Sequence, residues 1–233
     1  VLAQNNYSHD NGTPQAGGAG MSLSGVTHAQ AVRNRIENNT AAGVWSTFDA
    51  NDVKILNNTI RNNASGGITI GGGTVDIGLG PNNSGFEIKN NILSGNGSAG
   101  FATITVFASK NGMLERNKIE SSQYDNIQID GTQDILSTNW VILRNVCSSE
   151  PGIRDLGRSQ NIVLKSNLCQ TNINQQIPPA DLDLNARVDI FDYNLLVSDF
   201  GKTGDLVSDI NLDKKVDIFD YNILVANFGK NGS

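Results

Sequence analysis

Two stretches of the chain carry acidic and amide side chains at an identical spacing. One, DLDLNARVDIFD, begins at Asp181, and the other, DINLDKKVDIFD, begins at Asp209. In both stretches, oxygen-bearing side chains stand at the first, third, fifth, ninth and twelfth positions. These residues are Asp181, Asp183, Asn185, Asp189 and Asp192 in the first stretch, and Asp209, Asn211, Asp213, Asp217 and Asp220 in the second. The repetition predicts that both stretches perform the same chemistry.

Carboxylate and amide oxygens are the ligands that a hard cation such as Ca²⁺ prefers. The spacing arranges them around one point, and the last carboxylate can bind through both of its oxygens. The backbone carbonyls of Arg187 and Lys215, at the seventh positions, would each add one more ligand. An acidic, solvated tail is the alternative, but it does not account for the repeated spacing. We therefore predict two calcium sites.

Each stretch is followed by apolar residues at helical spacing, which predicts a short helix with one apolar face. These residues are Phe191, Leu195, Leu196 and Phe200 after the first stretch, and Phe219, Ile223, Leu224 and Phe228 after the second. Gly201 and Gly229 are expected to end the helices.

Residues 181–233 resemble dockerin type I modules, which pair two EF-hand-like loops with two helices. The resemblance rests on the duplicated ligand pattern, on Asp at position 12, and on Val188 and Val216 at position 8. It implies two bound calcium ions and a cohesin-like partner. Two features differ from the family. Position 6 is Ala186 and Lys214 in place of glycine, and positions 10 and 11 are Ile-Phe in both repeats, where cohesin-binding members carry small or polar residues. Self-assembly or capping is therefore an open alternative for this module.

The first 175 residues contain a second repeat, in which an apolar residue, two further residues, Asn, one residue and an apolar residue recur. The shared amides are Asn34, Asn58, Asn91, Asn117, Asn145 and Asn167. The whole chain has 31 Asn residues and only 6% aromatic residues, which favours stacked coils with polar corners over an aromatic-rich core. A stacked amide can donate to and accept from the backbone groups that such corners leave unpaired.

Two further columns of residues follow these asparagines. An apolar residue stands two positions after each asparagine, and a polar residue stands five positions after it. The apolar column is Ile36, Ile60, Leu93, Ile119, Cys147 and Cys169, and the polar column is Asn39, Asn63, Asn96, Ser122, Glu150 and Asn172. An Asn-rich β-sandwich is the alternative, but no strand is long enough for one and no hairpin signal recurs.

Residues 1 to about 175 resemble right-handed parallel β-helix proteins of the pectate-lyase-like type, on the strength of this repeat. The predicted fold class is therefore an all-β right-handed parallel β-helix, a solenoid, followed by a small α-helical dockerin/EF-hand-like module. The predicted domains are the β-helix over 1–175, a Pro-containing linker over 176–180 and the calcium module over 181–233.

The β-helix resemblance implies that a long polysaccharide can lie along one outward strand face. Residues Trp45, Thr69, Ala102, Gln128 and Arg154 are expected to face solvent there, next to inward-pointing Val44, Ile68, Phe101, Ile127 and Ile153. Of these, Trp45, Thr69 and Gln128 are candidate sugar-binding residues, because an aromatic ring covers a pyranose face and polar groups bind hydroxyls. The alternative is that Trp45 packs beneath the loop 71–85.

Asp130, Asp155 and Arg154 are the candidate catalytic residues, since they lie on or beside this face. No catalytic motif of polygalacturonases, pectate lyases or alginate epimerases is present in the sequence. The sequence therefore leaves open whether the protein is an enzyme.

Cys147 and Cys169 occupy the same position in successive coils, about 4.8 Å apart at their Cα atoms if the coils pair as strands. We expect two reduced thiols that pack as small apolar residues, with a disulfide as the alternative.

The net charge of −6 is concentrated at one end, because residues 181–233 hold ten Asp and only five Lys or Arg. The sequence contains no basic patch of the kind that binds nucleic acid. It also contains no apolar run long enough to predict a membrane span. Val1 lies inside a repeat, so we expect upstream sequence that includes an export signal.

Two functions are consistent with these patterns. The first is a secreted, extracellular polysaccharide-associated protein that binds or degrades a glycan and docks through its tail. The second is a non-catalytic structural or adhesive protein whose rod assembles through the calcium module. In either case the module is expected to cap the last coil near residues 168–172, because a solenoid end exposes unpaired strand edges. Ile190, Phe191, Ile218 and Phe219 are candidates to face that end or a partner.

Overall fold

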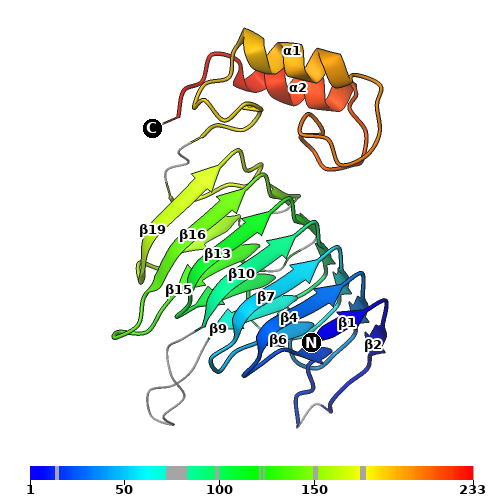
Figure 1. Ribbon diagram of the computed structural model, residues 1–233, viewed down its shortest axis with the longest axis vertical. Helices are drawn as coiled ribbons and strands as arrows, with labels where there is room; N and C mark the ends of the chain where they lie inside the picture. Colours follow the sequence, from blue (N-terminus) through cyan, green and yellow to red (C-terminus); the bar gives the residue numbers. More distant parts are fainter. Residues whose placement is uncertain are drawn as a thin grey trace.

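The computed structural model describes residues 1–13, 16–71, 83–97, 100–120, 122, 124–148, 152–173 and 177–232. Within these ranges the chain forms a parallel β-solenoid of three sheets, followed by two short helices (Figure 1). This confirms the predicted fold class of a parallel β-solenoid with a small helical region. The solenoid has about six turns, and successive turns add parallel strands to the sheets.

Each sheet is built from one strand per turn. The long sheet consists of β1 (Leu2–Gln4), β4 (Thr27–Val32), β7 (Asn51–Leu56), β10 (Ser84–Lys89), β13 (Lys110–Glu115), β16 (Ser137–Leu143) and β19 (Ser159–Lys165). The narrow sheet consists of β2 (Tyr7–His9), β5 (Arg35–Glu37), β8 (Thr59–Arg61), β11 (Ile92–Ser94), β14 (Lys118–Glu120) and β17 (Val146–Cys147). The groove sheet consists of β3 (Met21–Ser22), β6 (Val44–Ser46), β9 (Ile68–Gly71), β12 (Ile104–Phe107), β15 (Ile127–Asp130) and β18 (Ile153–Asp155).

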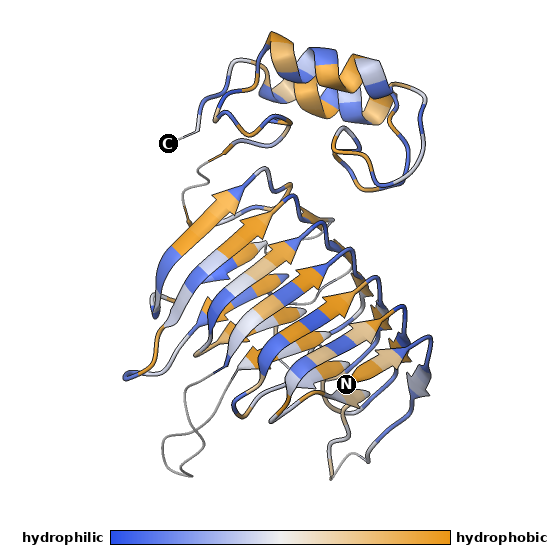
Figure 2. Cartoon of the chain, in the orientation of Figure 1, coloured by the Kyte–Doolittle hydropathy of each residue, from blue (hydrophilic) through white to orange (hydrophobic). Residues whose placement is uncertain are grey.

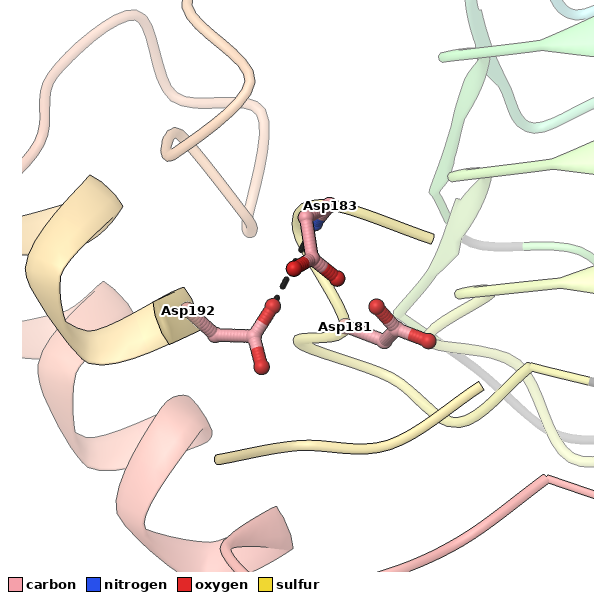
Figure 3. A group of neighbouring side chains, drawn as sticks. All are labelled: Asp181, Asp183 and Asp192. Atoms are coloured by element: carbon pink, nitrogen blue, oxygen red, sulfur yellow. Dashed lines mark hydrogen bonds between the residues drawn. The ribbon is translucent and has the colours of Figure 1, made fainter. Parts of the chain in front are cut away.

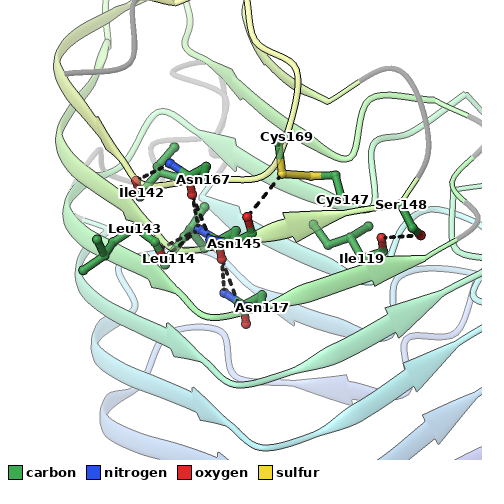
Figure 4. The surroundings of a disulfide bond; sticks show 10 residues. All are labelled: Leu114, Asn117, Ile119, Ile142, Leu143, Asn145, Cys147, Ser148, Asn167 and Cys169. Atoms are coloured by element: carbon green, nitrogen blue, oxygen red, sulfur yellow. Dashed lines mark hydrogen bonds between the residues drawn. A yellow bond between two sulfur atoms is a disulfide. The ribbon is translucent and has the colours of Figure 1, made fainter. Parts of the chain in front are cut away.

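The predicted asparagine ladder lies at the corner between the long and narrow sheets. Asn91 is fully buried, and its side-chain nitrogen donates to Ile55 O at 2.8 Å and to Asn117 Oδ1 at 2.9 Å. The same arrangement recurs from Asn6 to Asn167, and Figure 4 shows three of its rungs. Each amide therefore satisfies backbone groups that the tight corner would otherwise leave unpaired.

The residue before each ladder asparagine adopts a left-handed backbone conformation, with φ between 49° and 57°. These residues are Asn5, Arg33, Asn57, Asn90, Arg116, Arg144 and Ser166. Asparagine tolerates this conformation better than most residues, which explains the recurring Asn-Asn pairs in the sequence.

A second internal ladder joins Asn11, Asn39, Asn63 and Asn96, so the predicted polar column is correct in the first coils. It ends after Asn96. Asn172 instead accepts a hydrogen bond from Asp155 N, and Glu150 lies outside the described residues. The structure adds an exposed ladder that the sequence interpretation did not include, in which Asn161 donates to Asn139 and Asn139 to Asn111.

The core is the column of inward side chains between the three sheets. Ile36, Ile60, Leu93 and Ile119 are fully buried, as the repeat predicted. Strands alternate between hydrophobic and hydrophilic residues along their length (Figure 2). The fully buried Trp140 ring needs Gly112 in the preceding coil, because a Cβ atom there would lie 2.4 Å from the ring.

One inward position was assigned wrongly. Val44 and Ile68 pair in register with Ile104, not with Phe101, and Thr105 takes the outward place expected for Ala102. Ala102 is buried and Phe101 is exposed. The chain between Asn96 and Ile104 is longer than in the neighbouring coils, which displaces the strand by three residues relative to the sequence pattern.

Cys147 and Cys169 form a disulfide between the last two coils, with Cα atoms 4.9 Å apart (Figure 4). The expectation of two reduced thiols was therefore wrong. The two side chains are half-buried at the end of the apolar column, where stacking brings the sulfurs together.

The two helices, α1 (Ile190–Asp199) and α2 (Ile218–Asn227), lie beyond the last coil (Figure 1). Buried Val188, Leu196, Val216 and Leu224 form a core separate from that of the solenoid. No helix among the described residues is long and apolar enough to cross a membrane.

The chain after β19 adds a partial coil before it enters the helical module. Leu168, Thr171 and Ile177 each form an isolated parallel bridge with the preceding coil. Pro178 is buried and its carbonyl accepts a hydrogen bond from Ser166 Oγ, so this part of the predicted linker is packed against the solenoid. Residues 175 and 176, at the predicted domain boundary, lie outside the described residues.

The module contacts the solenoid at the corner of the asparagine ladder. Arg116 Nη1 donates to Leu206 O, and Arg144 Nη2 donates to Leu182 O, each at 2.9 Å. Gln170 and Asn172 stay exposed, so the prediction that the module covers residues 168–172 was wrong in its location. The partial coil already pairs with part of the last strand edges of the solenoid. The module is instead joined to the solenoid through Arg116 and Arg144.

Candidate metal loops and an aromatic groove

The first acidic loop brings three carboxylates together before α1. Oxygen atoms of Asp181, Asp183 and Asp192 lie within 4.8 Å of one another, and Figure 3 shows the three side chains converging. Asp192 Oδ1 accepts from Leu182 N at 2.6 Å, and its Oδ2 accepts from Asp189 N at 2.8 Å. Asp189 in turn caps the helix by accepting from Phe191 N. Helix capping and loop closure thus fix the position of Asp192.

The second loop repeats these hydrogen bonds. Asp220 Oδ1 accepts from Ile210 N at 2.7 Å, and its Oδ2 accepts from Asp217 N at 2.9 Å. Asp213 N donates to Asp209 Oδ1 at 3.1 Å, as Asn185 N does to Asp181 Oδ1 in the first loop. The repeated spacing in the sequence therefore yields two loops of the same local geometry.

The first loop concentrates negative charge in a buried place. Burial, a hydrogen bond with Asp183 and the charge of Asp192 raise the pKa of Asp181 to about 6. Asp181 is fully buried, and its Oδ2 atom has no hydrogen-bond partner. Burial also raises the pKa of Asp209 in the second loop. A cation would relieve both the repulsion and the unpartnered oxygen.

The donor set fits a hard cation. All side-chain groups at the predicted ligand positions are carboxylates or amides, and sulfur or imidazole ligands are absent from them. The ligand roles of the Arg187 and Lys215 carbonyls stay predictions. Both residues form an antiparallel bridge, Arg187 with Asn231 and Lys215 with Thr203.

The sixth loop position carries backbone strain, as its residue types predicted. Ala186 has φ of 71° and Lys214 has φ of 75°, in the left-handed region that glycine occupies at least cost. The loops therefore form without glycine, at an energetic penalty in each repeat.

An aromatic groove of about 610 Å³ lies on the outward face of the groove sheet. Trp45 and Phe101 are 40% and 48% exposed, so both rings are accessible to a ligand. Phe48 and Phe107 also line the groove. Its polar lining consists of hydroxyls, one amide and one carboxylate, from Thr47, Ser65, Thr69, Thr105, Gln128 and Asp130.

The structure brings the three predicted sugar-binding residues into this one groove. Trp45 pairs with Thr69 in adjacent coils, and Gln128 follows after Thr105. Phe48, Phe101 and Phe107 were missed, because they stand in turns or at strand ends whose register the repeat did not determine. Residues 72–82 of the loop expected over Trp45 lie outside the described residues.

The candidate catalytic residues are engaged in other contacts. Asp130 accepts from Arg158 through both oxygens, at 2.8 and 3.1 Å. Asp155 accepts from Gly157 N and Ser159 Oγ, and Arg154 Nη1 lies 3.7 Å from Asp125 Oδ2. The structure therefore does not bring these residues together as an acid and base pair.

The helices expose apolar side chains at the tenth and eleventh loop positions. Phe191 and Phe219 are 62% and 61% exposed, and Ile190 and Ile218 are also exposed. The hypothesis that these four residues face the coil end was wrong, because the loops and not these side chains contact the solenoid. We call these four residues the Ile-Phe surface.

Residues 1–83 match the family model described as a right handed beta helix region. The first coils of the solenoid are therefore similar in sequence to a right-handed β-helix region, and the parallel sheets of the structure agree with that similarity. No curated protein and no solved structure gives a significant match to the chain.

Proposed function

We propose that this protein is an extracellular glycan-binding β-helix protein whose C-terminal module binds two calcium ions and serves as a docking element. The observation that carries the proposal is the groove lined by Trp45, Phe48 and Phe101 with hydroxyl and amide groups on its floor. Such a surface matches a carbohydrate, because aromatic rings pack on the C–H face of a pyranose and polar side chains bind its hydroxyls.

Binding is favoured over degradation by the state of the acids near the groove. Asp130 lines the groove, but both of its oxygens are held by Arg158. Hydrolysis by two carboxylates needs a separate acid and base or nucleophile at a defined separation. The described lining of the groove contains no second acid.

The calcium part of the proposal rests on the two loops. They share hydrogen bonds and donor types, and the first holds a buried carboxylate oxygen with no partner in the structure. The core of the module consists of six buried apolar residues, so bound ions would supply much of its folding free energy.

An extracellular location is supported by the disulfide between Cys147 and Cys169, because such bonds persist in oxidising compartments. The docking role is supported by the Ile-Phe surface, which presents four large apolar side chains to solvent. A cohesin-like domain or another copy of the chain is the proposed partner type. The same surface supports the second candidate function, a rod that assembles through its calcium module.

The test of glycan binding uses the full chain with calcium and an array of soluble and insoluble polysaccharides. Hits are then measured by titration calorimetry. We expect Trp45→Ala and Phe101→Ala each to weaken binding by about tenfold or more, since each loses a stacked aromatic face. Trp45 fluorescence should change on binding, whereas Trp140 is fully buried and should not respond.

Phe191→Ala is the matched control, because it removes an equally exposed aromatic ring outside the groove. Its glycan affinity should equal that of the parent chain. Absence of binding to every polysaccharide, or equal affinities for the groove variants and the control, would overturn the glycan-binding function and favour the assembly rod.

A further inference from the structure

The charges around the groove restrict the kind of glycan that it can hold. No lysine, arginine or histidine belongs to the described lining, and the acid Asp130 is neutralised by Arg158. Arg154, which continues the outward row beyond Gln128, is paired with Asp125. The groove therefore offers no unpaired cation within its described lining.

We propose that the groove selects a neutral glycan and rejects polyuronates, which deepens the proposed function and rests on it. A uronate polymer would bring a carboxylate on every ring into a groove without a cation, and removing an unpaired charge from water is costly. A neutral glycan carries no charged group, and the C–H faces of its rings are apolar. Trp45 and Phe101 can stack on such faces, while Thr69, Thr105 and Gln128 bind hydroxyls.

The experiment compares one polyuronate with the same polymer after chemical reduction of its carboxyl groups, together with neutral β-linked glucan, xylan and mannan. We expect a neutral polymer to bind at least tenfold more tightly than the polyuronate, and carboxyl reduction to improve binding. Thr105→Lys should narrow that difference by placing a cation in the groove. Equal or tighter polyuronate binding would overturn the neutral selectivity but keep glycan binding. No binding to any polymer would overturn both.

A second observation concerns the joint between solenoid and module. Arg116 Nη1 donates to Leu206 O, and its Nη2 lies 3.9 Å from Oδ2 of the buried Asp209, the first residue of the second loop. The equivalent residue one coil later, Arg144, donates to Leu182 O in the first loop. The charge of Asp181 acts on Arg144, but among the described residues no ion pair within 4 Å joins the two, in contrast to Arg116 and Asp209. The two loops thus meet the solenoid differently.

We infer that Arg116 acts as a built-in competitor of the cation at the second loop, so that the two loops fill at different calcium concentrations. This inference rests on the proposed calcium sites. A guanidinium beside a first-position carboxylate repels an incoming divalent ion and shares the ligand with it. By linkage, calcium at the second loop weakens the contact of Arg116 with the module. Calcium concentration then sets how firmly the module is docked.

The test titrates the full chain with calcium in a calorimeter, with Arg116→Gln and Arg33→Gln as a matched pair. Arg33 occupies the same left-handed corner position, with φ of 51° against 53° for Arg116, and its side chain bonds to Asn5. Both substitutions place glutamine in the same left-handed backbone conformation, so they should carry the same backbone strain. We expect two separated binding steps in the parent chain and in Arg33→Gln, and an increase of the weaker affinity on the order of tenfold in Arg116→Gln.

Equal calcium affinities for the Arg116 and Arg33 variants would overturn the competition, as would two indistinguishable steps in the parent chain. A circular-dichroism melt of each variant checks that the helices are folded under the titration conditions. Arg116→Lys gives a second measurement, because it keeps the charge and should keep the separated steps.

Discussion

In the solenoid, the buried amide of Asn91 finds every hydrogen-bond partner within the chain, whereas in the module the buried Asp181 keeps one oxygen without a partner. Both regions are repeats that fold by stacking or pairing near-identical units. The solenoid repeats a neutral group that satisfies its neighbours above and below. The module repeats an acidic group that repels its own neighbours, and the proposed cations would offset that repulsion.

Calcium removal is the strongest test of this comparison. Chelation should unfold the helical module and leave the solenoid folded, because the one such carboxylate cluster among the described residues lies in the module. Melting curves with calcium should show one transition more than curves with chelator. Helical circular dichroism reports the module, and emission of Trp140 reports the solenoid core. Identical curves in the two conditions would argue against metal in either loop.

Breaking one rung of the ladder should have the next largest effect. Asn91→Ala removes the acceptor of the Asn58 backbone N–H and the bonds of Asn91 to Asn58 Nδ2 and Ile55 O in a buried corner, so the free energy of unfolding should fall by about 4 kcal/mol. Asn139→Ala removes a rung of the exposed ladder and places alanine at φ of 57°, so it should lower stability by only about 1 kcal/mol, mostly through backbone strain. Denaturant unfolding of the two variants measures the difference, and similar losses would contradict the distinction between the ladders.

Removal of the disulfide should destabilise the last coil specifically. The bond closes a loop of 22 residues, and its loss should cost about 3 kcal/mol through greater freedom of the unfolded chain. In the double variant Cys147→Ser with Cys169→Ser, hydrogen exchange should accelerate in β17 and the partial coil and stay unchanged in β4 and β7. Uniform acceleration along the rod would show that the solenoid unfolds as one unit instead.

Substitution by glycine should produce the smallest change in stability. The change should be an increase at the sixth loop position and a decrease inside a helix. Ala186→Gly should raise the stability of the module by about 1 kcal/mol, because φ of 71° is strained for alanine. Ala226→Gly makes the same change at an exposed site inside α2 and should lower it by about 1 kcal/mol. Thermal unfolding in the presence of calcium compares the two variants. If both variants were less stable than the parent chain, the left-handed conformation of Ala186 would not be a source of strain.

Much of this architecture was predictable because each ladder position demands one residue type. An asparagine that must bond both above and below, next to a left-handed residue, recurs in the sequence at Asn58, Asn91 and Asn117 and so fixes the coils. The loop ligands were equally visible as a duplicated pattern. The groove was predicted only in part, because Phe101 stands in an insertion where the repeat loses its register.

The joint and the disulfide depended on information that no single position carries. Arg116 and Arg144 look like ordinary corner arginines in the sequence, and only the folded chain brings Leu206 and Leu182 to them. A pair of stacked cysteines is compatible with thiols or with a bond, and the choice depends on how closely the last two coils approach. The local sequence pattern is enough to predict the coils. The disulfide and the arginine contacts depend on how closely segments far apart in the sequence approach one another.

The crossed pairing of the module has a mechanical consequence. Val188, beside the first loop, exchanges hydrogen bonds with Gly229 and Lys230, which follow α2. Gly232 N also donates to Ala186 O. The segments that lead to the rod and to the C-terminus leave this antiparallel pairing at the same end, so a pull between them breaks its bonds one after another, beginning with that of Gly232 to Ala186, before it loads either helix. Tension between the rod and anything attached at that end would load the first acidic loop before it could unravel α1 or α2.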